Sequence, residues 1–133
     1  MLIDVVCALI VNDRREVLAA QRSASMDLPG KWEFPGGKMG PGETPRQALV
    51  REIQEELDLA ITVQEELPAS VHQYEKKSIR LIPFVCSILS GNISLKEHQA
   101  YGWFRHTDLA ALDWAEADIP ILRQYVNKHL GTT

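Results

Sequence analysis

The sequence predicts an α/β fold in which helices cover both faces of a sheet. Segments rich in β-branched and apolar residues recur along the chain, and two other segments have the pattern of helices. Strands mixed with two main helices are typical of a layered sheet fold. The length of 133 residues suits a single hydrophobic core, so we expect residues 1–133 to form one domain.

The first third of the chain reads as strands and turns. Residues 2–11 are apolar and β-branched, which predicts a buried strand. A polar turn at residues 12–15 leads into a second strand at residues 16–22, and we expect these two strands to pair as a hairpin. A short strand at residues 32–34 is expected to stop at the Pro-Gly-Gly sequence that begins at Pro35.

A helix is predicted over residues 45–58. Thr44 is a suitable N-cap, Pro45 suits the first helical position, and Gln47 lies where a capping box requires it. An apolar stripe for packing against a core is formed by Leu49, Val50, Ile53 and Leu57.

Later strands are predicted over three segments, residues 61–74, 79–89 and 100–104. Pro68 interrupts the first of them. Thr107 or Asp108 is a candidate cap for a short helix. A C-terminal helix is predicted over residues 119–130, opened by Pro120.

Composition excludes several classes of function. A net charge of −4 argues against a binder of duplex DNA or RNA, which would carry a basic face. A nucleotide substrate stays compatible with this charge, because metal ions recruited by acidic residues can hold a polyphosphate. The N-terminal segment lacks a basic region and contains Asp4, which favours a core strand over a signal peptide. Without an apolar stretch long enough for a membrane, a cytoplasmic protein is expected.

The two cysteines give no sign of a metal site. Cys7 and Cys86 both lie in apolar, strand-like segments and lack the spacing of metal ligands. We expect two buried, reduced thiols.

The helix at residues 45–58 carries the clearest chemical signal. Glu52, Glu55 and Glu56 occupy positions i, i+3 and i+4, so their carboxylates share one face. Like charges at this spacing destabilise a helix by about 0.2–0.5 kcal/mol per pair. Mg²⁺ would reverse this effect, because it binds carboxylate oxygens together with substrate phosphates. A solvated acidic surface is the alternative interpretation of the helix alone.

The residues around this helix favour a ligand site. Gly36 and Gly37 allow the backbone to approach a ligand, and a glycine carbonyl can bind a metal. Taken alone, the two glycines are better explained by a plain turn. Glu43 precedes the helix, and Arg51 stands beside Glu52, where it can orient a carboxylate.

Together these residues resemble the Nudix box. Gly37 is followed after five residues by Glu43, after seven more by the run from Arg51 to Glu56, and then by Leu59. Asp58 departs from the pattern, since the family usually has glycine there. That glycine ends the helix in a left-handed conformation, which Asp tolerates at some cost. We therefore expect Asp58 to affect the stability of this end of the helix more than the chemistry of the site.

The resemblance extends across nearly the whole chain. Residues 21–22, 32–38, 96–99 and 117–120 are similar to the MutT-like branch of the family, including its members directed at cytidine triphosphate. The resemblance implies an α/β/α sandwich around a mixed sheet. It also implies a Mg²⁺-dependent hydrolase, with Mn²⁺ as a substitute, that cleaves a nucleoside triphosphate to monophosphate and pyrophosphate.

The resemblance assigns roles to individual residues. Divalent metal would be bound by the Gly36 carbonyl, Glu52, Glu55, Glu56 and Glu97. Glu97 would complete the metal site or help to activate the attacking water. Arg51 and Glu43 would support the metal ligands, and Lys38 would lie near the phosphates.

The sequence does not decide which nucleobase the substrate carries. Arg22 and Asp118 match positions that contact the base, although Asp118 would serve equally well as a helix cap. An ionised Asp only accepts hydrogen bonds, which suits the amine of cytosine or the N–H groups of 8-oxoguanine. Phe34 or Trp32 could stack on the base or pack in the core. We favour 8-oxo-dGTP, in nucleotide-pool sanitation and mutation avoidance, with CTP, dCTP or 5-methyl-dCTP as the alternative.

Three rival functions are weaker. A Nudix-fold protein that binds nucleotide without turnover would usually lose glutamates that this chain keeps. A Nudix hydrolase of ADP-ribose or dinucleoside polyphosphates fits the short chain and the pair Arg22 and Asp118 less well. A calcium-binding acidic protein would show the alternating acids of an EF-hand loop. The expected partner is therefore a small nucleotide, without a nucleic acid polymer or membrane, and the chain is expected to be a monomer or homodimer.

Overall fold

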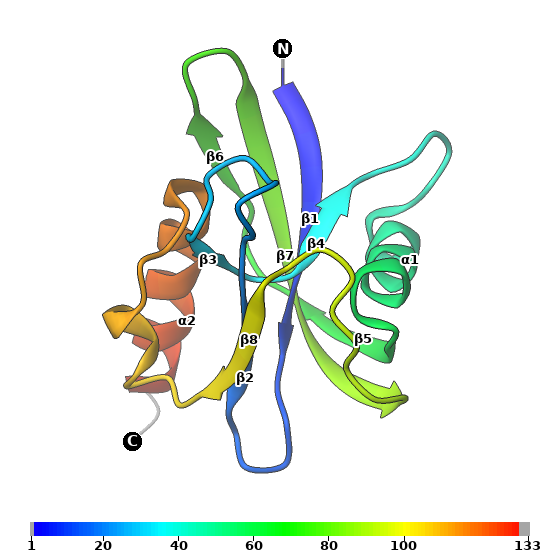
Figure 1. Ribbon diagram of the computed structural model, residues 1–133, viewed down its shortest axis with the longest axis vertical. Coiled ribbons are helices and arrows are strands. Elements are labelled where there is room, and N and C mark those ends of the chain that lie inside the picture. The colour runs from blue at the N-terminus through cyan, green and yellow to red at the C-terminus, as the bar shows by residue number, and fades with distance from the viewer. Residues whose placement is uncertain (1, 131–133) are drawn as a thin grey trace.

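The computed structural model describes residues 2–130, in which strands lie between two helices (Figure 1). The larger sheet has the order β4-β1-β7-β5, with β6 also paired to β7. Only β1 and β7 run parallel among these pairs, so the sheet is mixed, as predicted. Its strands are β1 (Leu2–Ile10), β4 (Gly36–Lys38), β5 (Ala60–Glu66), β6 (Ser70–Gln73) and β7 (Ser78–Ser90).

A smaller antiparallel sheet has the order β3-β2-β8. Its strands are β2 (Val17–Gln21), β3 (Trp32–Glu33) and β8 (Ala100–Phe104). The predicted hairpin between the first two strands of the chain is wrong: β1 and β2 lie in different sheets and meet through a single bridge from Val11 to Val17. β1 pairs instead with β7 along its whole length and with β4 at Val5–Cys7. β2 pairs with β3 and β8 in the smaller sheet.

Helices α1 (Pro45–Leu57) and α2 (Ile119–Leu130) lie on opposite sides of the strands, as predicted (Figure 1). Both capping-box hydrogen bonds between Thr44 and Gln47 are present. Asp58 ends α1 in the left-handed conformation, with φ 59° and ψ 34°. Short 3₁₀ helices η1 (Leu109–Ala111) and η2 (Glu116–Asp118) precede α2, with Asp108 at the cap position of η1.

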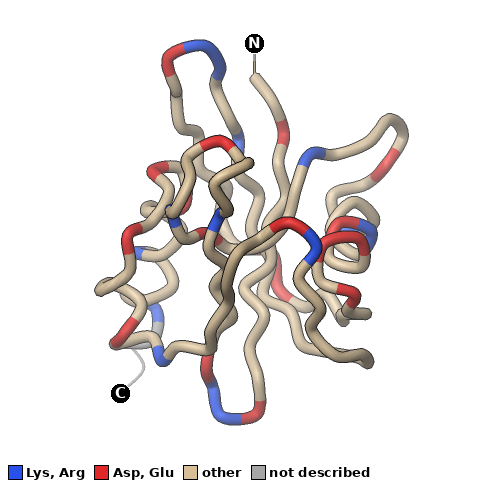
Figure 2. Tube along the Cα trace, viewed as in Figure 1, with Lys and Arg blue, Asp and Glu red and all other residues tan. Residues whose placement is uncertain are grey.

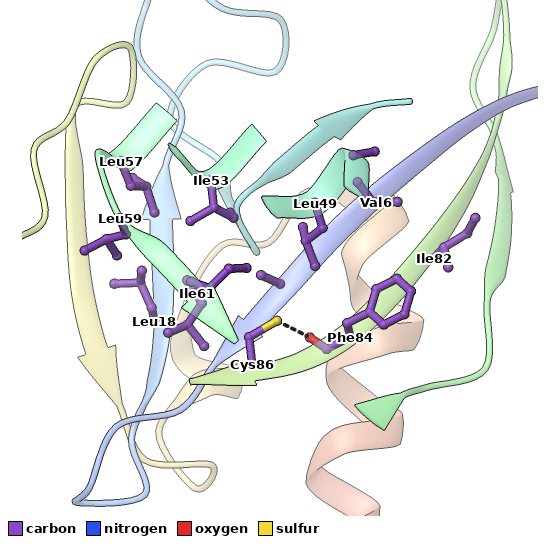
Figure 3. Close-up of a cluster of buried hydrophobic side chains, with 13 residues drawn as sticks. Val6, Leu18, Leu49, Ile53, Leu57, Leu59, Ile61, Ile82, Phe84 and Cys86 are labelled. Carbon is purple, nitrogen blue, oxygen red and sulfur yellow. Dashed lines mark hydrogen bonds between the residues drawn. The ribbon is translucent and has the colours of Figure 1, made fainter. Parts of the chain in front are cut away.

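Two apolar clusters hold these layers together. Leu49, Ile53 and Leu57 on α1 are fully buried against the larger sheet (Figure 3). Burying one such side chain contributes about 1.5–3 kcal/mol. Val50, predicted for the same stripe, is 42% exposed, and Ala48 takes its place in the core. On the other side, α2 contributes Ile121, Leu122 and Tyr125 to the second cluster.

Of the other predictions about local structure, those for Pro68 and the cysteines are confirmed and the one for Gly36 and Gly37 is wrong. The break at Pro68 is confirmed, since β5 and β6 lie on either side of it. Cys7 and Cys86 are buried free thiols, as predicted. The interpretation of Gly36 and Gly37 as a plain turn is wrong, because both belong to β4, which pairs with β1. Over residues 2–130, no helix is long and apolar enough to cross a membrane.

Candidate active site

A cavity of about 580 Å³ opens between the larger sheet and the loops near η2. Six residues that the sequence nominated for the site line this cavity: Arg22, Phe34, Gly36, Lys38, Glu56 and Asp118. Its lining does not include the nominated residues Arg51, Glu52, Glu55 and Glu97. The structure thus brings the predicted base contacts and one glutamate of α1 to the same space.

The two glycines of β4 are needed for close approach. A Cβ atom at Gly36 would overlap the carbonyl of Val6 on the neighbouring strand, and one at Gly37 would overlap the carboxylate of Glu52. Any larger residue at Gly37 would therefore push Glu52 away from β4. This explains physically why glycine and glutamate occur together in the sequence pattern.

Arg51 organises the acids on the outer part of α1. Its guanidinium donates two hydrogen bonds to Glu43, at 2.7 and 2.8 Å. It also donates to Glu52 at 2.9 Å, to Glu55 at 3.2 Å and to the Lys38 carbonyl at 3.2 Å. Together with a hydrogen bond from the Gly40 amide, Arg51 lowers the pKa of Glu43 to about 2. The supporting role predicted for Arg51 and Glu43 is consistent with these contacts.

Glu56 lies in different surroundings from the other acids of α1. Its Oε2 atom is buried and has no hydrogen-bond partner among the described residues. Burial, and then the charges of Glu33, Glu52 and Glu97, raise the pKa of Glu56 to about 9, against a hydrogen bond from the Gly36 backbone. A buried acid that faces three others is stable as a charge only with a cation beside it.

Glu97 comes from a distant part of the chain. The loop that carries it crosses the C-terminal end of α1, and acidic positions mark both the loop and the helix (Figure 2). The Ser94 amide donates to the Leu57 carbonyl at 2.9 Å, and the Lys96 amide donates to the Glu56 carbonyl at 3.3 Å. These bonds place Glu97, which is exposed, close enough to Glu56 to raise its pKa.

The donor set fits a divalent cation, although it is not assembled as a finished site. Among residues 2–130, no three His, Cys, Asp or Glu side chains converge closely enough to hold a metal ion. Arg51 engages Glu52 and Glu55, which turns these carboxylates toward its guanidinium. The partnerless oxygen of Glu56, with the charges of other carboxylates acting on it, has the chemistry that Mg²⁺ or Mn²⁺ would complete.

Asp118 on η2 also lines the cavity. Its side chain is buried, and its Oδ2 atom accepts a hydrogen bond from the Phe34 amide at 2.9 Å. Burial and the nearby charge of Glu33 raise the pKa of Asp118 well above its usual range. This hydrogen bond links Asp118 to the residue that follows β3.

Arg22 and Glu33 form an ion pair beside this pocket. The Arg22 Nη1 atom lies 2.8 Å from Glu33 Oε1, and its Nε atom donates to the Asp27 carbonyl. The side chains of the pair are 19% and 17% exposed, so both are mostly removed from water. The positive charge of Arg22 thereby offsets the negative charge of Glu33, which lies near Asp118.

The two candidate stacking aromatics have different positions. The Phe34 ring packs on Trp114, with centroids 4.7 Å apart, yet Phe34 also lines the cavity. Trp32 packs edge-on against Phe104 at 5.6 Å and is absent from the lining.

Three residues that line or border the cavity escaped the sequence analysis. Glu33 lines it, and a signal was present, because this acid stands between Trp32 and Phe34 in an otherwise apolar segment. Tyr74 and Lys77 line it from the turn between β6 and β7. Nothing in the local sequence of that turn indicates a site.

Comparisons with known proteins agree with this geometry. The family model described as NUDIX domain matches residues 1–125. The chain is 38% identical to a CTP pyrophosphohydrolase of Escherichia coli over 94% of this chain and 92% of that protein. It is 30% identical to an 8-oxo-dGTP diphosphatase of the same organism, over 90% and 93%. A solved structure of MutT from methicillin-resistant Staphylococcus aureus has a TM-score of 0.77 at 38% identity, covering 96% and 98%.

Proposed function

The chain belongs to the Nudix family of hydrolases, and on this premise we propose that it cleaves nucleoside triphosphates to the monophosphate and pyrophosphate with Mg²⁺. One observation carries the proposal: a single cavity joins Asp118 at the base end to Glu56, whose buried oxygen has no partner among the described residues. A nucleotide in this cavity would present its base to one end and its phosphates to the other.

The metal would be held by the carboxylates at the α1 end. We assign this role to the carbonyl of Gly36 and to Glu52, Glu55, Glu56 and Glu97. When bound, Mg²⁺ would offset the charge of the phosphates and lower the pKa of the attacking water. Arg51 would keep Glu52 and Glu55 oriented, and Lys38, exposed at the cavity wall, would attract the phosphates.

The reaction we propose is an in-line displacement at the β-phosphorus. A bond forms from the water oxygen to the β-phosphorus as the bond from that phosphorus to the oxygen shared with the α-phosphorus breaks. The nucleoside monophosphate leaves with that bridging oxygen, and the other product is pyrophosphate. Glu97 is our candidate to accept the proton of the water, since it is exposed on a loop that is anchored to α1.

For the base, we propose 8-oxo-dGTP as the substrate, in sanitation of the nucleotide pool. Asp118 would then pair with the polar edge of the oxidised purine, with Arg22 and Phe34 beside it. Cytosine triphosphates are the second candidate. The buried Asp118, whose pKa is raised, could offer cytosine both a donor and an acceptor, and the relative named as a CTP pyrophosphohydrolase is 38% identical.

The test is pyrophosphate release with Mg²⁺ from CTP, dCTP, 5-methyl-dCTP, dGTP and 8-oxo-dGTP, with ADP-ribose followed by its own products. We expect the highest kcat/KM for 8-oxo-dGTP. A preference for cytosine triphosphates would support the second candidate, and turnover of ADP-ribose alone would contradict both. Mg²⁺ should also raise the melting temperature, because it binds only the folded chain; 100 times its Kd would add about 2.7 kcal/mol.

A further inference from the structure

His98 is a buried polar side chain that the proposed mechanism does not use. Its side chain is only 1% exposed, and its Nε2 atom lies 2.7 Å from Glu33 Oε2. The other ring nitrogen, Nδ1, is buried and has no hydrogen-bond partner within the described part of the chain. Burying a ring nitrogen without a hydrogen-bond partner costs folding free energy, so packing alone does not account for a histidine at this position. Its hydrogen bond with Glu33 is what an apolar side chain could not supply.

The loop around His98 is attached at three places. Backbone amides of Ser94 and Lys96 donate to carbonyls at the end of α1, and the Gln99 amide donates to the Gln21 carbonyl of β2 at 3.0 Å. Between these anchors the side chain of His98 reaches Glu33 on β3. Glu97 therefore lies between one residue bound to α1 and another bound to the smaller sheet.

Glu33 extends this connection into the pocket for the base. One of its oxygens accepts from Arg22 and the other from His98, so both oxygens are occupied. The next residue, Phe34, donates its amide to Asp118. Contacts thus run without interruption from the loop of Glu97, through His98, Glu33 and Phe34, to the carboxylate of Asp118, which lines the cavity.

We propose that His98 is a positioning residue that couples base recognition to the placement of Glu97. This inference rests on the proposed function for the role of Glu97. A carboxylate oxygen accepts hydrogen bonds, so the tautomer of His98 that forms this bond carries its proton on Nε2 and donates it to Glu33. A base that moves Glu33 or Phe34 also moves His98, and with it the neighbouring Glu97. A poorly fitting base would thereby lower turnover as well as affinity.

The test compares His98→Leu with His98→Gln, because only glutamine offers an N–H donor near the position of Nε2. For His98→Leu we expect at least a tenfold loss of kcat on the preferred triphosphate. The ratio of kcat/KM between 8-oxo-dGTP and dCTP should also move toward one. His98→Gln should restore most of both. If the leucine variant does not fold, His98→Met replaces it, since a flexible side chain can fill the same space.

A double-mutant cycle separates positioning from general damage. In a Glu97→Gln background, His98→Leu should cost less than threefold in kcat, because the group that it positions is already absent. Additive losses would overturn the proposal, as would wild-type kcat and base ratio in His98→Leu. Failure of His98→Gln to rescue would also overturn it, because the hydrogen bond would then be irrelevant.

Amide hydrogen exchange gives a readout that needs no turnover. In His98→Leu the Lys96 and Gln99 amides should exchange at least about tenfold faster, with recovery in His98→Gln. Unchanged exchange would show that His98 does not hold the loop, and would overturn the proposal even with an active enzyme. A wild-type chain that cleaves no triphosphate would instead overturn the proposed function, and the exchange rates would still decide whether His98 holds this loop.

Discussion

The outer surface of α1 and the interior of the cavity both collect acidic side chains, but they compensate the charge in opposite ways. On the outer surface, Arg51 binds Glu43, Glu52 and Glu55, and the pKa of Glu43 falls to about 2. In the cavity, burial acts on Glu56, whose Oε2 atom is buried, and on Asp118, and neither forms an ion pair among the described residues, so their pKa values rise. The two regions adjoin through α1 and the neighbouring strand β4.

The difference separates acids that hold the structure together from acids that await a ligand. An acid paired with arginine is stabilised in the folded chain, so it supports the loop before α1 and the orientation of its neighbours. A buried acid without a partner costs folding free energy, and a bound cation offsets this cost. The comparison therefore predicts opposite effects on stability. Removing an acid that is paired with Arg51 should lower it, whereas removing Glu56 should raise it and lower activity.

The largest expected effect is that of Glu56→Gln. Loss of the carboxylate should lower kcat by about 100-fold or more, because Mg²⁺ would lose a direct ligand, and loss of an outer-shell partner already costs about 10–100-fold. Without metal, the same variant should be more stable at pH 7 by about 1–2 kcal/mol, because a buried acid has been removed. Pyrophosphate release and urea unfolding measure the two effects, and Glu66→Gln, at an exposed acid, is the control. Near-normal turnover would remove Glu56 from the metal site.

Asp118→Asn should change the choice of base more than the rate. Asparagine keeps an oxygen for the Phe34 amide but can no longer ionise, so one base contact changes character. A good bidentate contact discriminates by about 1–3 kcal/mol, so the kcat/KM ratio between 8-oxo-dGTP and dCTP should shift by about 10–100-fold. Glu116→Gln, at an exposed acid on the same 3₁₀ helix, should leave the ratio unchanged. An unchanged ratio in Asp118→Asn would return that residue to a structural role.

The pH dependence of stability should differ in sign between the two regions. Glu56 has its pKa raised from 4.5 to about 9, so the folded chain binds more protons between these values and its stability falls as pH rises. Glu43 has its pKa lowered from 4.5 to about 2, so its contribution is present above pH 4.5 and is lost as pH falls toward 2.

Metal-free unfolding curves at pH 6, 7 and 8 would test this difference. One group changes the free energy of unfolding by at most about 1.4 kcal/mol per pH unit. The slope should become shallower in Glu56→Gln, whereas Glu43→Gln should leave it unchanged in this range. Equal slopes in the wild type and Glu56→Gln would contradict the assignment. Asp118 acts in the same direction as Glu56, so the slope is not expected to vanish.

The smallest expected effect is that of Asp58→Gly. Asp58 holds the left-handed conformation that glycine adopts without strain, so glycine should stabilise the chain by about 0.5–1 kcal/mol. Its hydrogen bond from Gln54 is exposed and contributes little. Urea unfolding should show the gain, with kcat unchanged and with Asp58→Ala less stable than the wild type. A loss of stability in Asp58→Gly would show that the Asp58 side chain, rather than the backbone, stabilises this end of α1.

Local sequence was sufficient for α1 and its ends. The capping box, the spacing of the glutamates and the left-handed residue at Asp58 all depend on neighbours within a few positions, and the structure has each of them. Val50 was misjudged, because the width of the buried face depends on what packs against the helix. The hairpin failed for a similar reason, since the pairing of β1 with β7 involves residues about 76 positions apart.

By itself, the sequence determined the family, the α/β fold and the helix that carries three carboxylates on one face, because helical periodicity places residues at fixed spacing. Only the tertiary structure decided which of these acids Arg51 compensates, and that the Oε2 atom of Glu56 is buried with no hydrogen-bond partner among the described residues. It also decided that Glu33 and His98, 65 positions apart, share a hydrogen bond. Burial and charge balance depend on segments that come into contact only in the folded chain, and local sequence patterns do not predict those contacts.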